Sequence, residues 1–134
     1  DENWKANYVG RKLHPTSEAE SAFYDEKGFV QEIGKNVRSL KKEDAPGEFI
    51  GMLKLTARGA ELFKKSYEQS KIKYTDRPFQ QASSLKKAYL TDLFQEMVDN
   101  SIPVHCVKIQ NRWKELDTQE DFNNAKKSFK DMIL

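Results

Sequence analysis

The sequence predicts a single α/β domain in which short apolar strands alternate with amphipathic helices. Its 134 residues are enough for one domain with a hydrophobic core. Short apolar segments are followed along the chain by segments whose apolar residues recur at helical spacing. Because the predicted strands are mostly apolar rather than alternating, we expect helices to cover the sheet.

The first part of the chain predicts a β-hairpin followed by a buried strand. Residues 20–24 and 29–33 are the expected hairpin strands, and Asp25-Glu-Lys-Gly28 between them has a glycine available for positive φ. Residues 35–46 are charged and are expected to be an exposed connection. Residues 48–55 are mostly apolar, which favours a buried strand.

The middle of the chain predicts two helices. Thr56 is a capping residue for a helix over about 57–70. The strongest helical pattern runs from Ser83 or Ser84 to about Asn100. Its expected apolar stripe consists of Leu85, Ala88, Tyr89, Leu93, Met97 and Val98.

The last part predicts a strand and a capped helix. Residues 104–109 follow Pro103 and have the composition of a strand. Thr118 and Asp121 match a capping box, which predicts a helix that continues to about Ile133.

Composition narrows the classes of function. A net charge of +2 does not indicate a nucleic-acid binder, which usually carries a basic excess on one face. No apolar run has the length of a membrane span, so no membrane partner is expected. The single cysteine, Cys106, excludes an internal disulfide and fits a reducing, cytoplasmic location. No Gly-rich phosphate loop is present in the sequence.

Glu115 and Asp117 are the leading candidates for a metal site. In extended backbone their spacing directs both carboxylates to one face, immediately before the predicted helix start. Carboxylates beside a helix N-terminus suit a divalent metal and a phosphate. An ordinary acidic turn is the alternative interpretation.

Several other residues have a functional and a structural interpretation. Asp92 lies at the edge of an apolar stripe, where it either ends the stripe or points into a cation-accepting pocket. Glu48 begins an apolar strand, and Gly51 within that strand marks either tight packing or close approach of a ligand. Lys35 is most simply a solvated lysine.

The histidines and the cysteine do not indicate zinc. His14 precedes a proline and His105 lies in a predicted strand, and neither has a Cys or His partner at metal-ligand spacing. No catalytic signature surrounds Cys106, which is expected in the core.

Six segments, taken in order, resemble one known family. They are Asp1-x-x-Trp4 with Tyr8 and Arg11, His14-Pro-x-Ser17-Glu-Ala-Glu20, Gly34-Lys35, Gly47-Glu-Phe-Ile-Gly51, Ala88-Tyr-Leu-Thr-Asp92, and Trp113-x-Glu-x-Asp-Thr-x-Glu-Asp121. Together they resemble the second half of the nucleotidyltransferases. The similarity is closest to cytidylyltransferases that activate phosphocholine or 2-aminoethylphosphonate, which are often fused to, or encoded beside, phosphoenolpyruvate phosphomutase.

The resemblance implies a mononucleotide-binding α/β fold with a mostly parallel, mixed sheet and flanking helices. It implies a reaction that joins CTP to a phosphorylated or phosphonate acceptor and releases pyrophosphate, with Mg²⁺ as cofactor. Residues 1–134 would be the acceptor-side half of the domain. The implied Mg²⁺ ligands are Asp1 and Asp117, with Glu115 nearby.

The resemblance also implies an acceptor site. Lys35 matches the family lysine that contacts the acceptor phosphate, and Glu48 and Gly51 match the strand that lines the acceptor pocket. Tyr89 and Asp92 fall where the cationic end of the acceptor would sit. Arg11 belongs to the same expected substrate-binding set.

The sequence departs from the family pattern because the first half, with its Gly-rich triphosphate signature, is not in it. We therefore expect the chain alone to be inactive, and a cut sheet edge to favour homo-oligomers. Two alternatives are a fragment of a sugar-phosphate nucleotidyltransferase and a small, non-catalytic interaction module.

Overall fold

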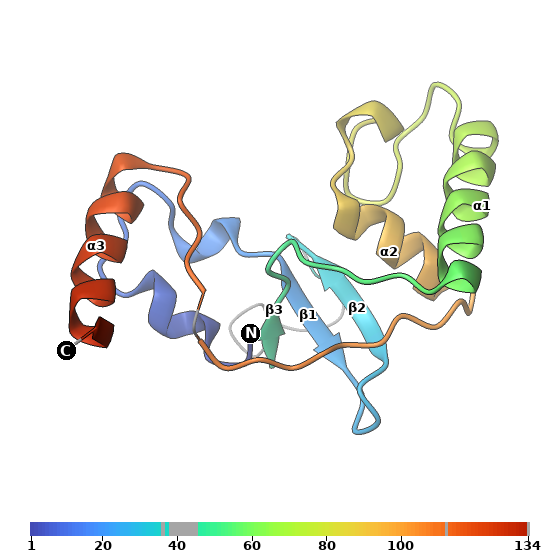
Figure 1. Cartoon of the computed structure of the whole chain (residues 1–134). Helices are drawn as coiled ribbons and strands as arrows, with labels where there is room; N and C mark the ends of the chain where they lie inside the picture. Colours follow the sequence, from blue (N-terminus) through green and yellow to red (C-terminus); the bar gives the residue numbers. More distant parts are fainter. Residues whose placement is uncertain (36, 38–45, 112, 134) are drawn as a thin grey trace.

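The computed structural model describes residues 1–35, 37, 46–111 and 113–133, and the side chains of residues 128–133 are outside this description. The described chain is a mixed α/β structure with a three-stranded antiparallel sheet and three α-helices. Figure 1 shows the sheet between two groups of elements. Helices α1 (Ala57–Lys73) and α2 (Leu90–Asp99) lie at one end, and α3 (Gln119–Ile133) lies at the other.

The predicted hairpin is confirmed. Strand β1 (Ser21–Tyr24) pairs antiparallel with β2 (Val30–Gly34), with Ala22 opposite Ile33. In the turn, the Asp25 carboxylate accepts hydrogen bonds from the backbone N–H groups of Lys27 and Phe29, both at 2.9 Å. Gly28 has φ +85°, and a Cβ there would lie 2.9 Å from His105 Nε2, so both backbone and space require glycine.

The predicted strand over residues 48–55 is wrong in extent. Strand β3 (Gly47–Glu48) has two residues and pairs with β1, which gives the order β2-β1-β3. Gly51 has φ +77°, outside the extended region, and residues 51–55 are exposed. The positive φ at Gly51 interrupts the extended backbone before the apolar residues that follow can join the sheet.

Two further expectations about the sheet need correction. All strand pairs among the described residues are antiparallel, whereas a mostly parallel sheet was expected. Residues 104–109 contain no strand and pair with the hairpin through an isolated bridge between His105 and Phe29. Val104 and Cys106 each exchange one backbone hydrogen bond with the hairpin, at 2.9 and 2.8 Å, but Val107 is 85% exposed. Val104 and Cys106 pack against the main core, whereas the exposed residues after Cys106 gain little from a longer ladder.

The helices largely follow the sequence pattern. The Thr56 hydroxyl accepts a hydrogen bond from Gly59 N at 3.0 Å, which caps α1 as expected. Helix α2 begins at Leu90, later than predicted, because Leu85–Lys87 form a 3₁₀ turn instead. The Asp92 carboxylate accepts the backbone N–H of Tyr89 at 2.8 Å and so fixes this later start. Within the described residues, no helix combines the length and apolar character that a bilayer crossing requires.

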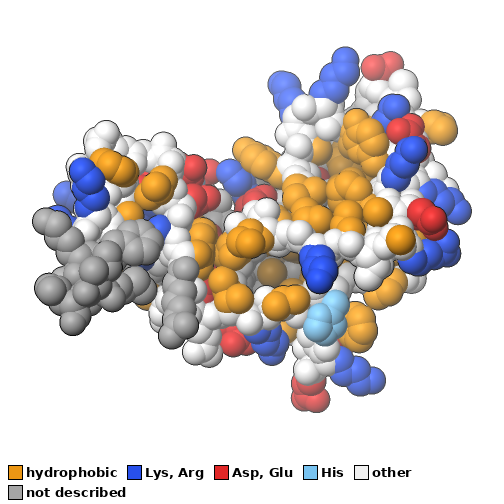
Figure 2. Space-filling view, in the orientation of Figure 1, with side chains coloured by type: hydrophobic (Ala, Val, Ile, Leu, Met, Phe, Trp, Pro, Cys, Tyr) orange, Lys and Arg blue, Asp and Glu red, His pale blue; other side chains and the backbone are white. Residues whose placement is uncertain are grey.

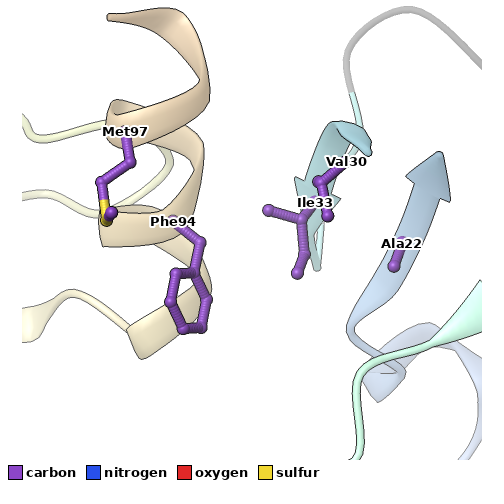
Figure 3. Packing of buried hydrophobic residues seen from close by; sticks show 5 residues of the cluster. All are labelled: Ala22, Val30, Ile33, Phe94 and Met97. Atoms are coloured by element: carbon purple, nitrogen blue, oxygen red, sulfur yellow. The ribbon is translucent and has the colours of Figure 1, made fainter. Parts of the chain in front are cut away.

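The main core lies between the sheet and α2. Figure 3 shows Phe94 and Met97 of α2 facing Val30 and Ile33 of β2, with Ala22 of β1 beyond them. All five side chains are buried. Gln95 Oε1 also accepts the backbone N–H of Ile33 at 2.8 Å, so α2 satisfies part of the edge of β2.

A second core cluster lies on the other face of the sheet. Phe23 alternates with Ala22 along β1 and packs with Trp4, Tyr8 and Ala19. Trp4 and Tyr8 belong to the 3₁₀ helix η1 (Trp4–Tyr8) and make an edge-to-face ring contact at 5.8 Å. This cluster fixes Tyr8, and with it the segment that contains Arg11 and His14.

Phe94→Ala is expected to lower the free energy of unfolding by about 3–5 kcal/mol, because it empties the centre of the main core. Urea denaturation followed by circular dichroism measures the change. The control is Ile72→Ala, since Ile72 is 81% exposed on α1. A cost for Phe94→Ala no larger than that of the control would show that α2 does not pack on the sheet as described.

Candidate cation site

Two segments from opposite ends of the chain meet beside the sheet. The backbone N–H of Glu2 donates to the carbonyl oxygen of Ile109 at 2.9 Å. Asn111 N and Trp113 Nε1 donate to the Asp1 carboxylate at 3.0 and 2.7 Å. In Figure 1 the orange segment that leads to α3 runs beside the N-terminus. The contacts place residues 113–121 against residues 1–14.

Asp1 is the anchor of this junction. Besides Asn111 and Trp113, its carboxylate accepts hydrogen bonds from Asn3 N at 2.9 Å and Asn7 Nδ2 at 3.2 Å. A carboxylate has about four lone-pair positions, and these four donors occupy them. The geometry therefore gives Asp1 a structural role, and its role as a metal ligand stays a prediction.

Arg11 is buried among acidic side chains. Its side chain is 6% exposed, and Nε lies 2.8 Å from Asp121 Oδ1 while Nη2 lies 3.6 Å from Glu115 Oε2. The Nε contact is short but outside hydrogen-bond geometry, so the attraction is chiefly electrostatic. The guanidinium carbon also lies 4.9 Å from the centre of the Tyr8 ring. Arg11 thus joins the end of η1 to the start of α3.

The predicted capping box at the start of α3 is confirmed. The Asp121 carboxylate accepts hydrogen bonds from Thr118 N at 2.9 Å and Thr118 Oγ1 at 2.8 Å, and Thr118 Oγ1 accepts from Asp121 N at 3.2 Å. Burial raises the pKa of Asp121, but the bonds from Thr118 and the charge of Arg11 outweigh it and hold the pKa below its ordinary value. Asp121 is therefore ionised, and its role is to cap α3.

Glu48 is buried next to this cluster. It is 6% exposed, and Oε1 accepts a short hydrogen bond from the Tyr8 hydroxyl. Oε2 is buried with no hydrogen-bond partner among the described residues. Burial raises the pKa of Glu48 to about 7; the bond from Tyr8 opposes this rise and the charge of Glu115 adds to it. Glu48 is thus an acid that gains or loses a proton near neutral pH.

His14 joins the two acids that the sequence singles out. Its Nδ1 lies 3.0 Å from Asp117 Oδ2, and its Nε2 lies 3.8 Å from Glu115 Oε2. One donor atom from each of the three residues lies within 4.8 Å of the others, and all three side chains are partly exposed. Carboxylate oxygens at this separation fit a divalent cation. Sequence reasoning missed His14 because its acidic partners lie at the far end of the chain.

The cluster has an excess of negative charge. Its acids are Asp1, Glu48, Glu115, Asp117 and Asp121. Among the described residues, the cationic side chains in ion pairs with these acids are Arg11 and, when protonated, His14. The ammonium group of Asp1 also acts on Glu48, whose raised pKa reduces its own charge near neutral pH.

Three of the remaining predicted site residues, Lys35, Tyr89 and Asp92, form a separate group at the start of α2, and Gly51 is not part of it. Lys35 Nζ lies 3.0 Å from Glu18 Oε2 and 4.4 Å from the centre of the Tyr89 ring. Asp92 is 4% exposed, and its carboxylate accepts the backbone N–H groups of Tyr89 and Gln81. Gly51 is exposed, and a Cβ there would touch nothing within 4 Å. The substrate-binding roles predicted for these residues stay predictions.

An apolar cavity lies beside this second group. Its volume is about 320 Å³, and it opens between α1 and α2. Figure 2 shows hydrophobic side chains gathered on this side of the molecule. Its lining includes Phe63, Tyr67, Phe79, Leu85, Tyr89 and Leu93. The aromatic rings give the cavity surfaces that attract both apolar groups and cations.

Comparison of the chain with protein-family models, curated proteins and solved structures finds no match. Its function is therefore inferred from its residues and their geometry.

Glu48→Gln is expected to flatten the pH dependence of stability between about pH 4.5 and pH 7. The pKa of Glu48 rises from 4.5 to about 7 on folding, so its stabilising contribution is full below the unfolded pKa and is lost as pH rises through the folded pKa. The loss amounts to at most about 3 kcal/mol.

Chemical denaturation at several pH values measures this effect. Glu26→Gln, at an exposed position in the hairpin turn, is the control and is expected to retain the wild-type slope. If the free energy of unfolding of Glu48→Gln depends on pH as steeply as that of the wild type, the raised pKa of Glu48 in the folded protein is contradicted.

Trp113→Phe is expected to cost about 1–3 kcal/mol of stability, because it removes a donor to the Asp1 carboxylate and keeps an aromatic ring. In the wild type, the indole N–H resonance of Trp113 is also expected to be protected from solvent exchange. Rapid exchange of that proton together with an unchanged unfolding free energy would show that the two segments do not meet at Asp1.

Proposed function

We propose that this chain is the acceptor-side part of a Mg²⁺-dependent cytidylyltransferase. The reaction would join CTP to a phosphocholine-like or 2-aminoethylphosphonate-like acceptor and release pyrophosphate. The proposal rests on the family resemblance of the ordered segments. The observation that supports it is the gathering of Glu115 and Asp117 with residues from the opposite end of the chain into one acidic cluster.

In this proposal Glu115 and Asp117 hold the cation. Mg²⁺ bound there supplies neutralisation of phosphate charge, which is the main requirement of nucleotidyl transfer. Asp1 holds Trp113 and Asn111 and so positions the segment that carries both acids. Arg11 holds Glu115 on one side and Asp121 on the other. The chain's own contribution is a preorganised pair of carboxylates.

Lys35 and Tyr89 are proposed to receive the acceptor. A lysine attracts a phosphate or phosphonate as a point charge. The Tyr89 ring already has the Lys35 ammonium 4.4 Å from its centre, so its face suits the cationic end of an aminoalkyl acceptor. The apolar cavity beside Tyr89 provides room for methyl groups on that cation. Asp92 supports this arrangement by holding the backbone of Tyr89.

The nucleotidyltransferase fold belongs to the same proposal. The antiparallel sheet β2-β1-β3 would be one part of the larger mixed sheet of that fold. Association of copies through an exposed edge also stays a prediction. Both edges of the sheet are already partly occupied: Gln95 Oε1 accepts the N–H of Ile33 on β2, and the backbone N and O of Asp1 bond to the O and N of Glu48 on β3, at 2.8 and 3.0 Å.

Two alternative functions compete with this proposal. A sugar-phosphate acceptor would use the same cation cluster, and an acceptor panel separates it from aminoalkyl acceptors. One observation favours a non-catalytic interaction module. The carboxylates of Asp1, Asp92 and Asp121 all accept hydrogen bonds that stabilise the fold. In such a module the acids would only cap and position backbone.

The test is pyrophosphate release by the longest natural form of the protein with CTP, Mg²⁺ and a panel of acceptors. Asp117→Asn is expected to reduce the rate by about 100-fold, because it weakens a cation ligand. Glu61→Gln is the control, since Glu61 is exposed on α1. The 134-residue chain alone is expected to be inactive.

Pyrophosphate release at the wild-type rate by Asp117→Asn would contradict the proposed cation ligand. A lack of release with every acceptor would favour the interaction module. Activity confined to sugar phosphates would replace the proposed acceptor class.

A further inference from the structure

We propose that His14 is a third ligand of the cation held by Glu115 and Asp117, so that this site binds a divalent transition ion such as Co²⁺ or Mn²⁺ more tightly than Mg²⁺. The inference rests on the proposed function in placing a cation at these two acids. It adds an imidazole ligand and reverses the expected preference among ions.

The orientation of the His14 ring is the first argument. Both ring nitrogens face carboxylates, Nδ1 at 3.0 Å from Asp117 Oδ2 and Nε2 at 3.8 Å from Glu115 Oε2. A neutral imidazole has one N–H donor and one lone pair. With the ring proton on Nε2, the Nδ1 lone pair faces Asp117 Oδ2 at 3.0 Å, a spacing that one ion coordinated by both atoms would span, while Nε2 is too far from Glu115 for a hydrogen bond. His14 and Asp117 are thus placed to bind one ion together, with an oxygen of Glu115 within 4.8 Å.

The position of the ring is the second argument. The His14 side chain is 17% exposed, and its ring centre lies 6.1 Å from that of Tyr8. Pro15 follows it and restricts its backbone to extended conformations. Tyr8 is itself held in the second core cluster. The ring is therefore placed before any ion arrives, while the exposed sides of Glu115 and Asp117 leave a path for entry.

The surrounding charge is the third argument. The Tyr8 hydroxyl donates to one oxygen of Glu48, and the other oxygen is buried without a hydrogen-bond partner among the described residues. Glu48 also interacts with the charge of Glu115. When ionised, this buried carboxylate adds negative charge close to Glu115, and that charge attracts a cation to the side of the site that carries Glu115.

The ligand set decides the preference among ions. Mg²⁺ prefers oxygen ligands and keeps several of its waters. Imidazole nitrogen suits first-row transition ions, and their affinity for mixed nitrogen and oxygen sites rises from Mn²⁺ towards Cu²⁺. One nitrogen with two carboxylates therefore favours a transition ion, whereas the two carboxylates alone do not.

The test is calorimetric titration of the chain with Co²⁺ and, separately, with Mg²⁺. His14→Gln is expected to weaken Co²⁺ binding about tenfold or more, by analogy with the loss of a supporting metal-site residue, and to change Mg²⁺ binding by no more than about twofold. His105→Gln is the matched control. His105 is the other histidine of the chain, and it pairs with Phe29 of the β-hairpin rather than with Glu115 or Asp117. Its Co²⁺ affinity is expected to equal that of the wild type.

A second measurement needs no variant. Bound Co²⁺ is expected to broaden or shift the ring-proton resonances of His14 in the wild type before those of His105. Asp117→Asn is expected to weaken binding of both ions.

The outcomes separate the two proposals. Unchanged Co²⁺ affinity in His14→Gln, or unperturbed His14 resonances, would overturn the imidazole ligand while leaving the acidic cation site in place if Asp117→Asn still weakens Mg²⁺ binding. If Asp117→Asn binds both ions as tightly as the wild type does, the cation site is overturned as well. Tight Co²⁺ binding that depends on His14, without Mg²⁺ binding, would support the inference and contradict Mg²⁺ as the cofactor.

Discussion

The buried guanidinium of Arg11 is the contact on which the candidate site depends. It lies between Asp121, which opens α3, and Glu115, which belongs to the segment before that helix. A buried charge is stable only when it is paired, so Arg11 draws the start of α3 onto the end of η1. His14 then lies beside Glu115 and Asp117 because it follows Arg11 by only three residues.

The acids of the chain divide into two kinds. Asp1, Asp92 and Asp121 accept backbone or side-chain donors that fix where segments begin and meet. Glu115 and Asp117 are more exposed, and their contacts are with the side chains of Arg11 and His14, at 3.0 to 3.8 Å. A carboxylate whose oxygens face other side chains is able to exchange those contacts for a cation. The functional proposals therefore rest on this second pair.

Local signals were predictable from the sequence and long-range ones were not. The hairpin around Gly28 and the capping residue Thr56 depend on neighbours within a few residues, and the structure confirms them. The strand expected over residues 48–55 ends early because the backbone at Gly51 turns to positive φ, which an apolar pattern does not reveal. The pairing of His14 with Asp117 joins opposite ends of the chain, so no spacing rule finds it.

The most direct test of the account is a double-mutant cycle between Arg11→Met and Asp121→Asn, measured as free energies of unfolding. If the ion pair joins the two ends of the chain, the two substitutions are expected to be coupled by about 2 kcal/mol, within the range of contacting residues. The double variant would then be less destabilised than the sum of the single variants. Additive effects, within about 0.5 kcal/mol, would contradict the junction on which the candidate site is built.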